Sequence, residues 1–187
     1  MLNHKGTKML RSNKITLRKF GFEDYESVFN NWTRDKDVFK FMTWGPHREL
    51  EETRTMVNYW AFMSNNDNYY NWCITLNDNT NDSIGGIGVS SINEEKRSGE
   101  IGYCLAQDHW NEGIATESLR MCLDYLFNDV NFSQINGICD IRNTASLEVM
   151  KKCGMKLTEF LPGYKTLSDG TLSDVQKLVI FREDIRN

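Results

Sequence analysis

The residues with the clearest chemical meaning surround Gly113, where a strand pattern gives way to a helix pattern. Ile101, Tyr103 and Leu105 alternate with smaller or more polar residues, the period-two pattern of a half-buried strand. After a polar turn at 107–109, apolar residues recur at helical spacing. The first N–H groups of such a helix have no internal partners, and the helix dipole adds positive potential. This stretch therefore predicts an anion site where the helix begins.

Two common phosphate-binding motifs do not explain this anion site. A P-loop requires G-x-x-x-x-G-K-[ST], and a dinucleotide fold requires G-x-G-x-x-G after its first strand. The sequence contains neither pattern. An ordinary nucleotide-binding α/β protein is therefore disfavoured.

The segment Trp110–Ala115, WNEGIA, resembles the R/Q-x-x-G-x-G/A loop of the GCN5-related N-acetyltransferases (GNAT). In that family the loop amides hold the pyrophosphate of acetyl-CoA. Further matches are similar to the branch that includes the RimJ- and RimL-type ribosomal-protein acetyltransferases. They are EIGY at 100–103, ATESL at 115–119, NTAS at 143–146 and KCGM at 152–155.

The resemblance implies an α/β (α+β) fold, a single domain with a mixed, mostly antiparallel sheet flanked by about four helices. The strand at Glu100 and the strand at Gln134 would splay apart in a V, with acetyl-CoA in the gap. The expected cofactor contacts are Tyr103, Cys104, Leu105, Trp110, Asn111, Glu112, Gly113, Ile114, Ala115, Thr116, Asn143 and Ser146. The strand residues would contribute backbone groups, and the Trp110 ring is expected to staple the loop. Asn111 stands where this branch commonly has glycine, and asparagine tolerates left-handed backbone better than most residues.

Acetyl transfer to an amine requires a base, because an alkylamine has a pKa of about 10 and is protonated at neutral pH. By resemblance to histone acetyltransferases with an E-I-x-aromatic strand, Glu100 is the predicted base. A water relay or a purely solvated carboxylate is the alternative. By resemblance to RimL-type enzymes, Ser146 is the predicted acid near the departing sulfur; the alternative is a serine bonded to local backbone. RimL-type enzymes also use a glutamate before the last strand, and Lys165 stands there.

Three aromatic or imidazole side chains lie where family members shape the acceptor pocket: Phe41, Trp44 and His47. Aromatic clusters are more often core, which is the alternative for Phe41 and Trp44. The acceptor is expected to be a protein N-terminal amine, as in ribosomal proteins, or a small amine such as a polyamine, amino acid or antibiotic. A non-catalytic module that binds acyl-CoA is the rival from another class.

Composition limits the partners. The chain has 187 residues, 22 basic and 26 acidic, with a net charge of −4, which argues against a dedicated nucleic-acid surface. No apolar run approaches the roughly twenty residues of a membrane span, and the N-terminus has no signal-peptide core. The five cysteines show no CxxC and no metal spacing, as in a cytoplasmic protein with reduced thiols. Cys104 is not expected to be a nucleophile, since direct transfer forms no covalent enzyme intermediate. A monomer or homodimer is expected.

The elements that must position these residues follow from periodicity and turn signals. One domain over 1–187, with a core of about 14–183, is expected. Strands are predicted at 14–19, 70–76, 84–92, 100–105, 134–141, 155–161 and 175–181, and helices at 25–32, 49–63, 113–127 and 143–154. Residues 162–173 are predicted to form a flexible polar loop.

Overall fold

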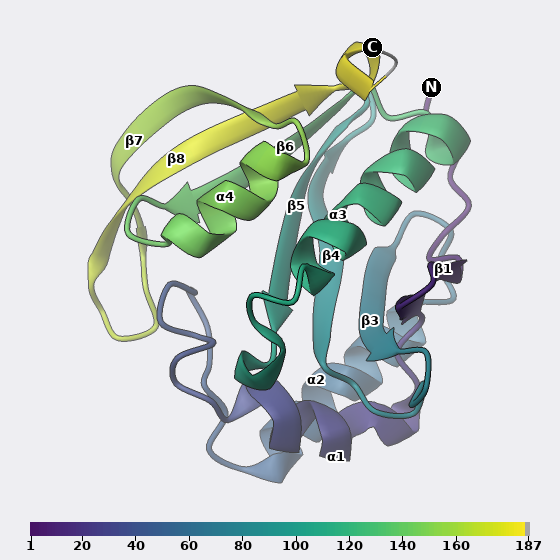
Figure 1. The fold of residues 1–187 in the computed structure, drawn as a ribbon, viewed down its shortest axis with the longest axis vertical. Coiled ribbons are helices and arrows are strands. Elements are labelled where there is room, and N and C mark those ends of the chain that lie inside the picture. The colour runs from purple at the N-terminus through teal and green to yellow at the C-terminus, as the bar shows by residue number, and fades with distance from the viewer. Residues whose placement is uncertain (186–187) are drawn as a thin grey trace.

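A computed structural model describes residues 1–185 and shows one eight-stranded sheet in the order β1-β2-β3-β4-β5-β6-β8-β7 (Figure 1). The strands are β1 (Leu10–Arg11), β2 (Ile15–Arg18), β3 (Tyr70–Leu76), β4 (Gly85–Asn93), β5 (Ser98–Leu105), β6 (Gln134–Asp140), β7 (Lys156–Thr166) and β8 (Leu172–Phe181). The helices are α1 (Tyr25–Val28), α2 (Leu50–Met63), α3 (Ile114–Tyr125) and α4 (Thr144–Lys152). Turns of π-helix at Phe29–Thr33 and Leu126–Val130 continue α1 and α3, and 3₁₀ turns lie at Phe22–Asp24, Gln107–His109 and Arg182–Ile185.

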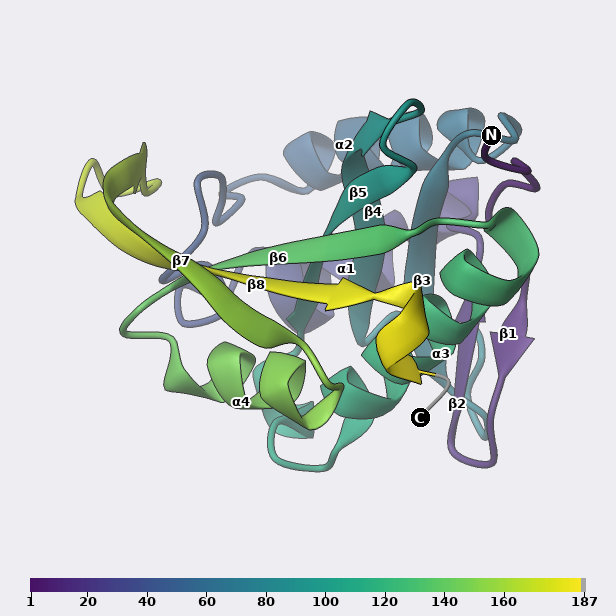
Figure 2. The same ribbon diagram turned by 90° about the horizontal axis from the view of Figure 1, so that it is seen from above.

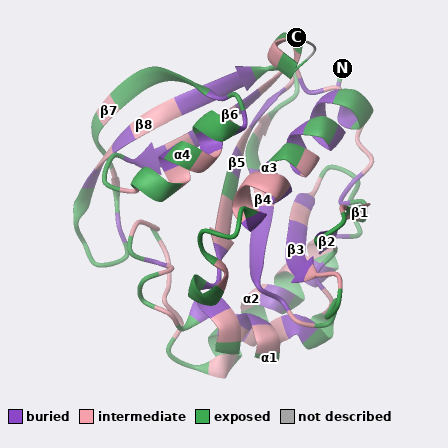
Figure 3. Ribbon diagram, in the orientation of Figure 1, coloured by how far each residue is buried: buried purple, intermediate pink, exposed green. Residues whose placement is uncertain are grey.

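The sheet separates two helical layers (Figure 2). Helices α3 and α4 cover one face and pack on a large core that includes Trp72, Ile101 and Leu119. Helices α1 and α2 cover part of the other face and pack on a smaller core that includes Trp32 and Cys73. The middle strands are accordingly buried along much of their length (Figure 3).

The sheet opens between β5 and β6. These strands are parallel and pair only at Ser98↔Gln134, Gly99↔Ile135 and Glu100↔Asn136, although both continue beyond this point. All the other strand pairs are antiparallel. The predicted mixed, mostly antiparallel sheet with diverging central strands is therefore confirmed.

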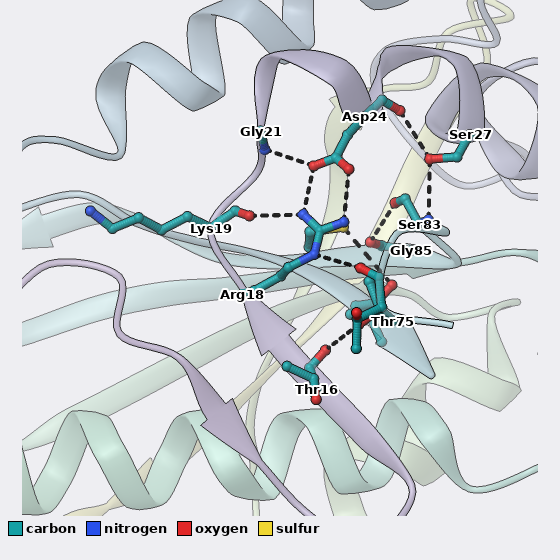
Figure 4. A network of polar contacts seen from close by, with 12 residues as sticks. Thr16, Arg18, Lys19, Gly21, Asp24, Ser27, Thr75, Ser83 and Gly85 are labelled. Atoms are coloured by element: carbon teal, nitrogen blue, oxygen red, sulfur yellow. Dashed lines mark hydrogen bonds and ion pairs between the residues drawn. The ribbon is translucent and has the colours of Figure 1, made fainter. Parts of the chain in front are cut away.

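A buried ion pair fixes α1 against the sheet (Figure 4). The guanidinium of Arg18 on β2 donates two hydrogen bonds of 2.7 Å to the carboxylate of Asp24, which is only 2% exposed. Asp24 also accepts from the Gly21 N–H, and its carbonyl accepts from the Ser27 hydroxyl. Because a buried charge is costly without its partner, this pair commits the chain to one position for α1.

The predicted elements are present within a few residues of their expected ends, with one clear error. Residues 162–173 are not a flexible loop, because β7 runs to Thr166 and β8 begins at Leu172, leaving a short turn between them. The ladder shifts register between Leu161 and Lys165, next to Pro162, where proline is tolerated because β7 is an edge strand. The Gly163 N–H bonds to the Asp174 carboxylate in place of a ladder partner. Among residues 1–185, no helix is long and apolar enough to cross a membrane.

Candidate active site

A cavity of about 1000 Å³ occupies the place where β5 and β6 part. Its walls come from the end of β5, the loop and first turn of α3, one side of α4, and residues 37, 38 and 40–42. Most of the residues expected to contact a cofactor line it: Tyr103, Cys104, Leu105, Trp110, Asn111, Gly113, Ile114, Ala115, Thr116, Asn143 and Ser146. Glu112 and the predicted base Glu100 are not part of this lining.

The start of α3 presents free backbone donors to the cavity. Gly113 is the N-cap with φ 80°, and Asn111 has φ 63°, so both adopt the left-handed conformation. The first intrahelical bond runs from the Glu117 N–H to the Gly113 carbonyl. The N–H groups of the three residues between them therefore have no partner within the helix. A methyl group at Gly113 would meet nothing within 4 Å, so glycine is required there by its backbone angle and not by lack of space.

The side chains of Trp110 and Lys14 hold this loop in place. The Trp110 indole N–H donates a 2.8 Å hydrogen bond to the Leu105 carbonyl, which agrees with the expected stapling role. Glu112 is exposed, and Lys14 Nζ bonds to its carboxylate at 3.4 Å and to its carbonyl at 3.3 Å. Lys14 is the main cause that lowers the pKa of Glu112. The carboxylate is thus paired outside the cavity, and it leaves the amides inside free for an anion.

The β5 backbone offers peptide groups to the open gap. The Ala106 N–H bonds to the Ile84 carbonyl, so alternation along an antiparallel ladder turns the groups of Tyr103 and Leu105 away from β4. They point toward β6, whose pairing with β5 ends at Glu100. The Leu105 carbonyl is occupied by Trp110, whereas Tyr103 retains a donor and an acceptor for an extended ligand with amide groups.

Asn143 and Ser146 begin α4 on the far wall of the cavity. The Asn143 side-chain oxygen accepts from the Ser146 N–H at 3.1 Å, which is the expected N-cap bond. The Ser146 hydroxyl lies 2.9 Å from the Tyr103 hydroxyl, which also donates to the Ser146 carbonyl at 3.1 Å. This serine therefore does not bond only within its own helix. Its partner comes from β5, across the gap.

Glu100 lies at the apex of the V, in the last residue pair before the strands part. Its neighbours Ile101 and Leu105 belong to the core under α3, so alternation places the Glu100 side chain on the opposite face, with Cys104. Burial raises the pKa of Glu100, while the charges of Lys165 and Lys177 lower it. The carboxyl group is half-buried beside the gap and faces the layer of α1 and α2.

Cys104 reaches the cavity but does not behave as an activated thiol. Burial raises its pKa to about 12. A thiol with such a pKa is almost entirely protonated at neutral pH and is a poor nucleophile. The expectation that Cys104 is not the attacking group agrees with this environment.

The three residues expected at the acceptor are divided by the structure. Phe41 lines the cavity, and the Arg142 guanidinium lies over its ring at 5.6 Å. Trp44 packs edge-on against Phe39 at 4.7 Å, and His47 bonds to the Thr53 hydroxyl at 2.7 Å. Neither lines the cavity, and burial lowers the pKa of His47. Trp44 thus occupies the position of a core aromatic.

Several cavity residues were not expected. The missed basic groups are Lys40, Arg142 and Lys152; the lining also contains Asp37 and Glu148, and Arg142 is paired with Asp140. Ala145, Val149 and Lys152 line one side of α4 at i, i+4 and i+7. Helical spacing from Ala145 would have identified that side, whereas Lys40 belongs to an irregular segment whose position depends on tertiary contacts.

The geometry fits one class of ligand. Free amides at the start of α3 suit a phosphate group, and the peptide groups of β5 suit an extended chain with amides. No group of three or more His, Cys, Asp or Glu side chains within residues 1–185 is arranged to hold a metal ion. A long thiol cofactor with a diphosphate combines these features.

Comparisons with known proteins agree with this geometry. The family model described as the acetyltransferase (GNAT) domain matches residues 14–156. An uncharacterized N-acetyltransferase, p20 of Bacillus licheniformis, is 27% identical over 175 residues, covering 94% of this chain and 97% of that protein. The crystal structure of a GNAT-family acetyltransferase from Bacillus anthracis is 27% identical with a TM-score of 0.80, covering 94% of this chain and 99% of that one.

More distant similarities include enzymes with different acceptors. Spermidine N(1)-acetyltransferase of Vibrio cholerae is 21% identical over 176 residues, covering 94% of this chain and 98% of that protein. Ribosomal-protein-S5-alanine acetyltransferase from Vibrio fischeri shares the fold at 16% identity and a TM-score of 0.81, covering 95% and 98% of the two chains.

The microcin C7 self-immunity acetyltransferase MccE also shares the fold, at 18% identity and a TM-score of 0.80, covering 91% of this chain and 93% of that one. Its structure was solved with acetyl-CoA and AMP. The match over residues 14–156, the split sheet and the amide-lined cavity lead to one conclusion. The chain belongs to the GNAT acetyltransferase family, as an acetyl-CoA-dependent N-acetyltransferase.

Proposed function

We propose that this enzyme acetylates a primary amine at the N-terminus of a protein, with Glu100 as the base and Ser146, in the position expected for the acid, as the hydrogen-bond donor to the departing sulfur. The observation that carries the proposal is the position of Glu100 at the apex of the β5–β6 gap. The gap connects the cavity on the α3 and α4 side with the face on which Glu100 lies. Donor and amine then approach the reaction from opposite faces of the sheet.

As the base, Glu100 accepts the proton that the attacking amine must lose. Burial raises the pKa of its carboxyl group above the ordinary value, which makes the carboxylate a better proton acceptor than an exposed one. Lys165 and Lys177 oppose this shift and keep the group ionised. Bound acetyl-CoA supplies the thioester, whose acetyl carbon is the electrophile.

In the position expected for the acid, Ser146 directs its hydroxyl group at the departing sulfur as a hydrogen-bond donor. Asn143 fixes the first turn of α4 through the Ser146 N–H, so the hydroxyl is held at the cavity wall. Negative charge develops on the sulfur as the thioester breaks, and a hydrogen bond placed there stabilises it. The thiolate takes its proton from solvent as it leaves.

The charges around Glu100 favour a peptide N-terminus over a polyamine. Lys177 lies on the same face as Glu100, because its neighbours Leu178 and Ile180 point into the core under α4. An acceptor with one positive charge can pair with Glu100, whereas the remaining charges of spermidine would meet Lys165 and Lys177. The RimJ/RimL branch, to which we assign the chain, includes ribosomal-protein acetyltransferases, and the name of the Vibrio fischeri structure gives an alanine of ribosomal protein S5 as the target of that protein.

The test is a screen of thiol release from acetyl-CoA with alanine- and serine-initiated peptides, spermidine and free amino acids. The peptides should react fastest. For the best acceptor, Glu100→Gln should lower kcat by roughly 10²-fold or more, with acetyl-CoA binding retained. Spermidine as the best acceptor would overturn the choice of acceptor, and an unchanged E100Q rate would overturn the choice of base.

The screen also excludes or supports the rival function, a non-catalytic acyl-CoA-binding module. Such a module would bind acetyl-CoA in calorimetry but release no thiol with any amine. Four of the five cysteines are buried and burial raises the pKa of Cys104 to about 12, so the protein adds little background to a thiol reagent.

A further inference from the structure

We propose that Tyr103 is a positioning residue that aims the Ser146 hydroxyl at the departing sulfur, an inference that rests on the proposed role of Ser146. The two hydroxyl groups lie 2.9 Å apart and come from opposite walls of the cavity, Tyr103 from β5 and Ser146 from α4. Both residues line the cavity. The contact therefore spans the gap where the thioester must react.

The single proton of the phenol decides what Ser146 can do. The Tyr103 hydroxyl is within reach of the Ser146 carbonyl at 3.1 Å and of its hydroxyl oxygen at 2.9 Å. A carbonyl can only accept a hydrogen bond. A phenol that donates its proton to the carbonyl can therefore only accept a hydrogen bond from the serine hydroxyl. A phenol that donates to the hydroxyl oxygen instead releases the serine proton, which can then point to the Cys139 sulfur or into the cavity toward a ligand. The second arrangement is the productive one.

The productive arrangement also strengthens Ser146 as a donor. A hydroxyl that accepts one hydrogen bond polarises and donates a stronger one, because successive bonds in a chain reinforce each other. Burial raises the pKa of Tyr103, so the phenol keeps its proton through the neutral range. Tyr103 thus acts through Ser146 and does not itself touch the sulfur.

The balance of the step is simple. The nitrogen lone pair forms the C–N bond, the C–S bond breaks with its electron pair going to sulfur, and the amine proton goes to Glu100. Ser146 donates its hydrogen bond to the sulfur while Tyr103 donates to Ser146. Neither hydroxyl gives up its proton permanently, and the thiolate is protonated by solvent.

A double-mutant cycle with Tyr103→Phe and Ser146→Ala tests this, using the fastest amine of the screen or, without one, slow hydrolysis of acetyl-CoA. Tyr103→Phe should lower kcat by roughly 5–10-fold, the value of one hydrogen bond, with little change in the Kd of acetyl-CoA. In the Ser146→Ala background the same change should have no further effect, because residues that act as a unit are not additive.

Tyr125→Phe is the matched control. Its buried hydroxyl donates a 2.7 Å bond to the Gly6 carbonyl and lies outside the cavity, so kcat should not change. A wild-type kcat for Ser146→Ala would overturn the role of the serine, and with it the proposal. A reduced kcat for Ser146→Ala together with a wild-type kcat for Tyr103→Phe would overturn the role of Tyr103 alone. Equal losses from Tyr103→Phe in both backgrounds would show independent action, which also overturns it.

Discussion

Replacing Gly113 with alanine tests whether the left-handed start of α3 holds the cofactor. A Cβ at this position would meet nothing within 4 Å, so the substitution introduces no clash. What remains is the free energy of placing an L-residue at φ 80°, which is about 1–2 kcal/mol. Because the perturbation is confined to backbone strain, its size is known before the experiment.

That strain must be measurable in one of two places. If the loop keeps its conformation, the free energy of unfolding falls by about 1–2 kcal/mol and Tm by roughly 2–8 °C. If the loop relaxes, stability is retained, but binding of acetyl-CoA must restore the conformation and weakens by roughly 5–30-fold. The loss of stability and the loss of binding free energy should together equal about 1–2 kcal/mol.

Urea unfolding of the free enzyme and calorimetric titration with acetyl-CoA measure the two losses. Gly170→Ala is the control, because Gly170 also has positive φ and open space but lies in the turn between β7 and β8. That variant should lose stability without losing affinity. A Gly113→Ala protein with both the stability and the affinity of the wild type would refute the assignment of the α3 start as the anion site.

Three further predictions concern Asn143, Asp140 and Glu100. Asn143→Ala should lower the free energy of unfolding by about 1 kcal/mol through loss of the α4 cap. Asn143→Asp should keep the cap, so a weaker affinity for acetyl-CoA in that variant would reveal a lost amide donor, and equal stability of N143A and wild type would contradict the cap. Arg142 and Ser173 hold the pKa of the buried Asp140 at about 2, below its ordinary value of 3.8. A carboxyl with a lowered pKa stabilises the fold above its unfolded pKa, so about 2 kcal/mol should be lost as the pH falls from about 4 to about 2. Urea unfolding at pH 7 and pH 2 should show a loss that is larger in the wild type than in Asp140→Asn by about that amount, and equal losses would be evidence against it. Because burial raises the pKa of Glu100 from 4.5, kcat/KM should fall as the pH drops through the raised value. A pH profile unaltered in shape by Glu100→Gln would argue against its role as the base.

The sequence predicts the backbone around the cavity well because that backbone depends on local signals. Three local signals each predict a backbone conformation that the structure has. They are the alternation through Tyr103, the glycine at 113 and the cap at Asn143. These elements meet in one cavity because they follow consecutive strands at the point where β5 and β6 separate.

The segment in which the sequence places the acceptor residues, 41–47, is less predictable because tertiary contacts decide its conformation. Residues 37–42 lie without regular strand or α-helix, held in part by the bond from the Ser168 N–H to the Met42 carbonyl. Pro162 and Gly163 suggest a loop by composition, but an edge strand with a bulge accommodates them. Trp44 packs in an aromatic core and Phe41 lies in the cavity wall. Both positions follow from tertiary packing, which the residues next to them in the sequence do not predict.

The two hydrophobic cores on either face of the sheet have a consequence for how such an enzyme can change. The core under α3 and α4 supports the start of α3 and one wall of the cavity, and the core under α1 and α2 supports the face from which we propose that the amine approaches. Substitutions that share no contacts have nearly additive effects. Substitutions at Phe39 and Trp44, which do not line the cavity, should therefore change the proposed amine face with little effect on acetyl-CoA binding, whereas substitutions at Val38, Met42 or Cys104, which pack on the same core and line the cavity, should affect both. A single scaffold can in this way diverge in acceptor while its donor chemistry stays constant.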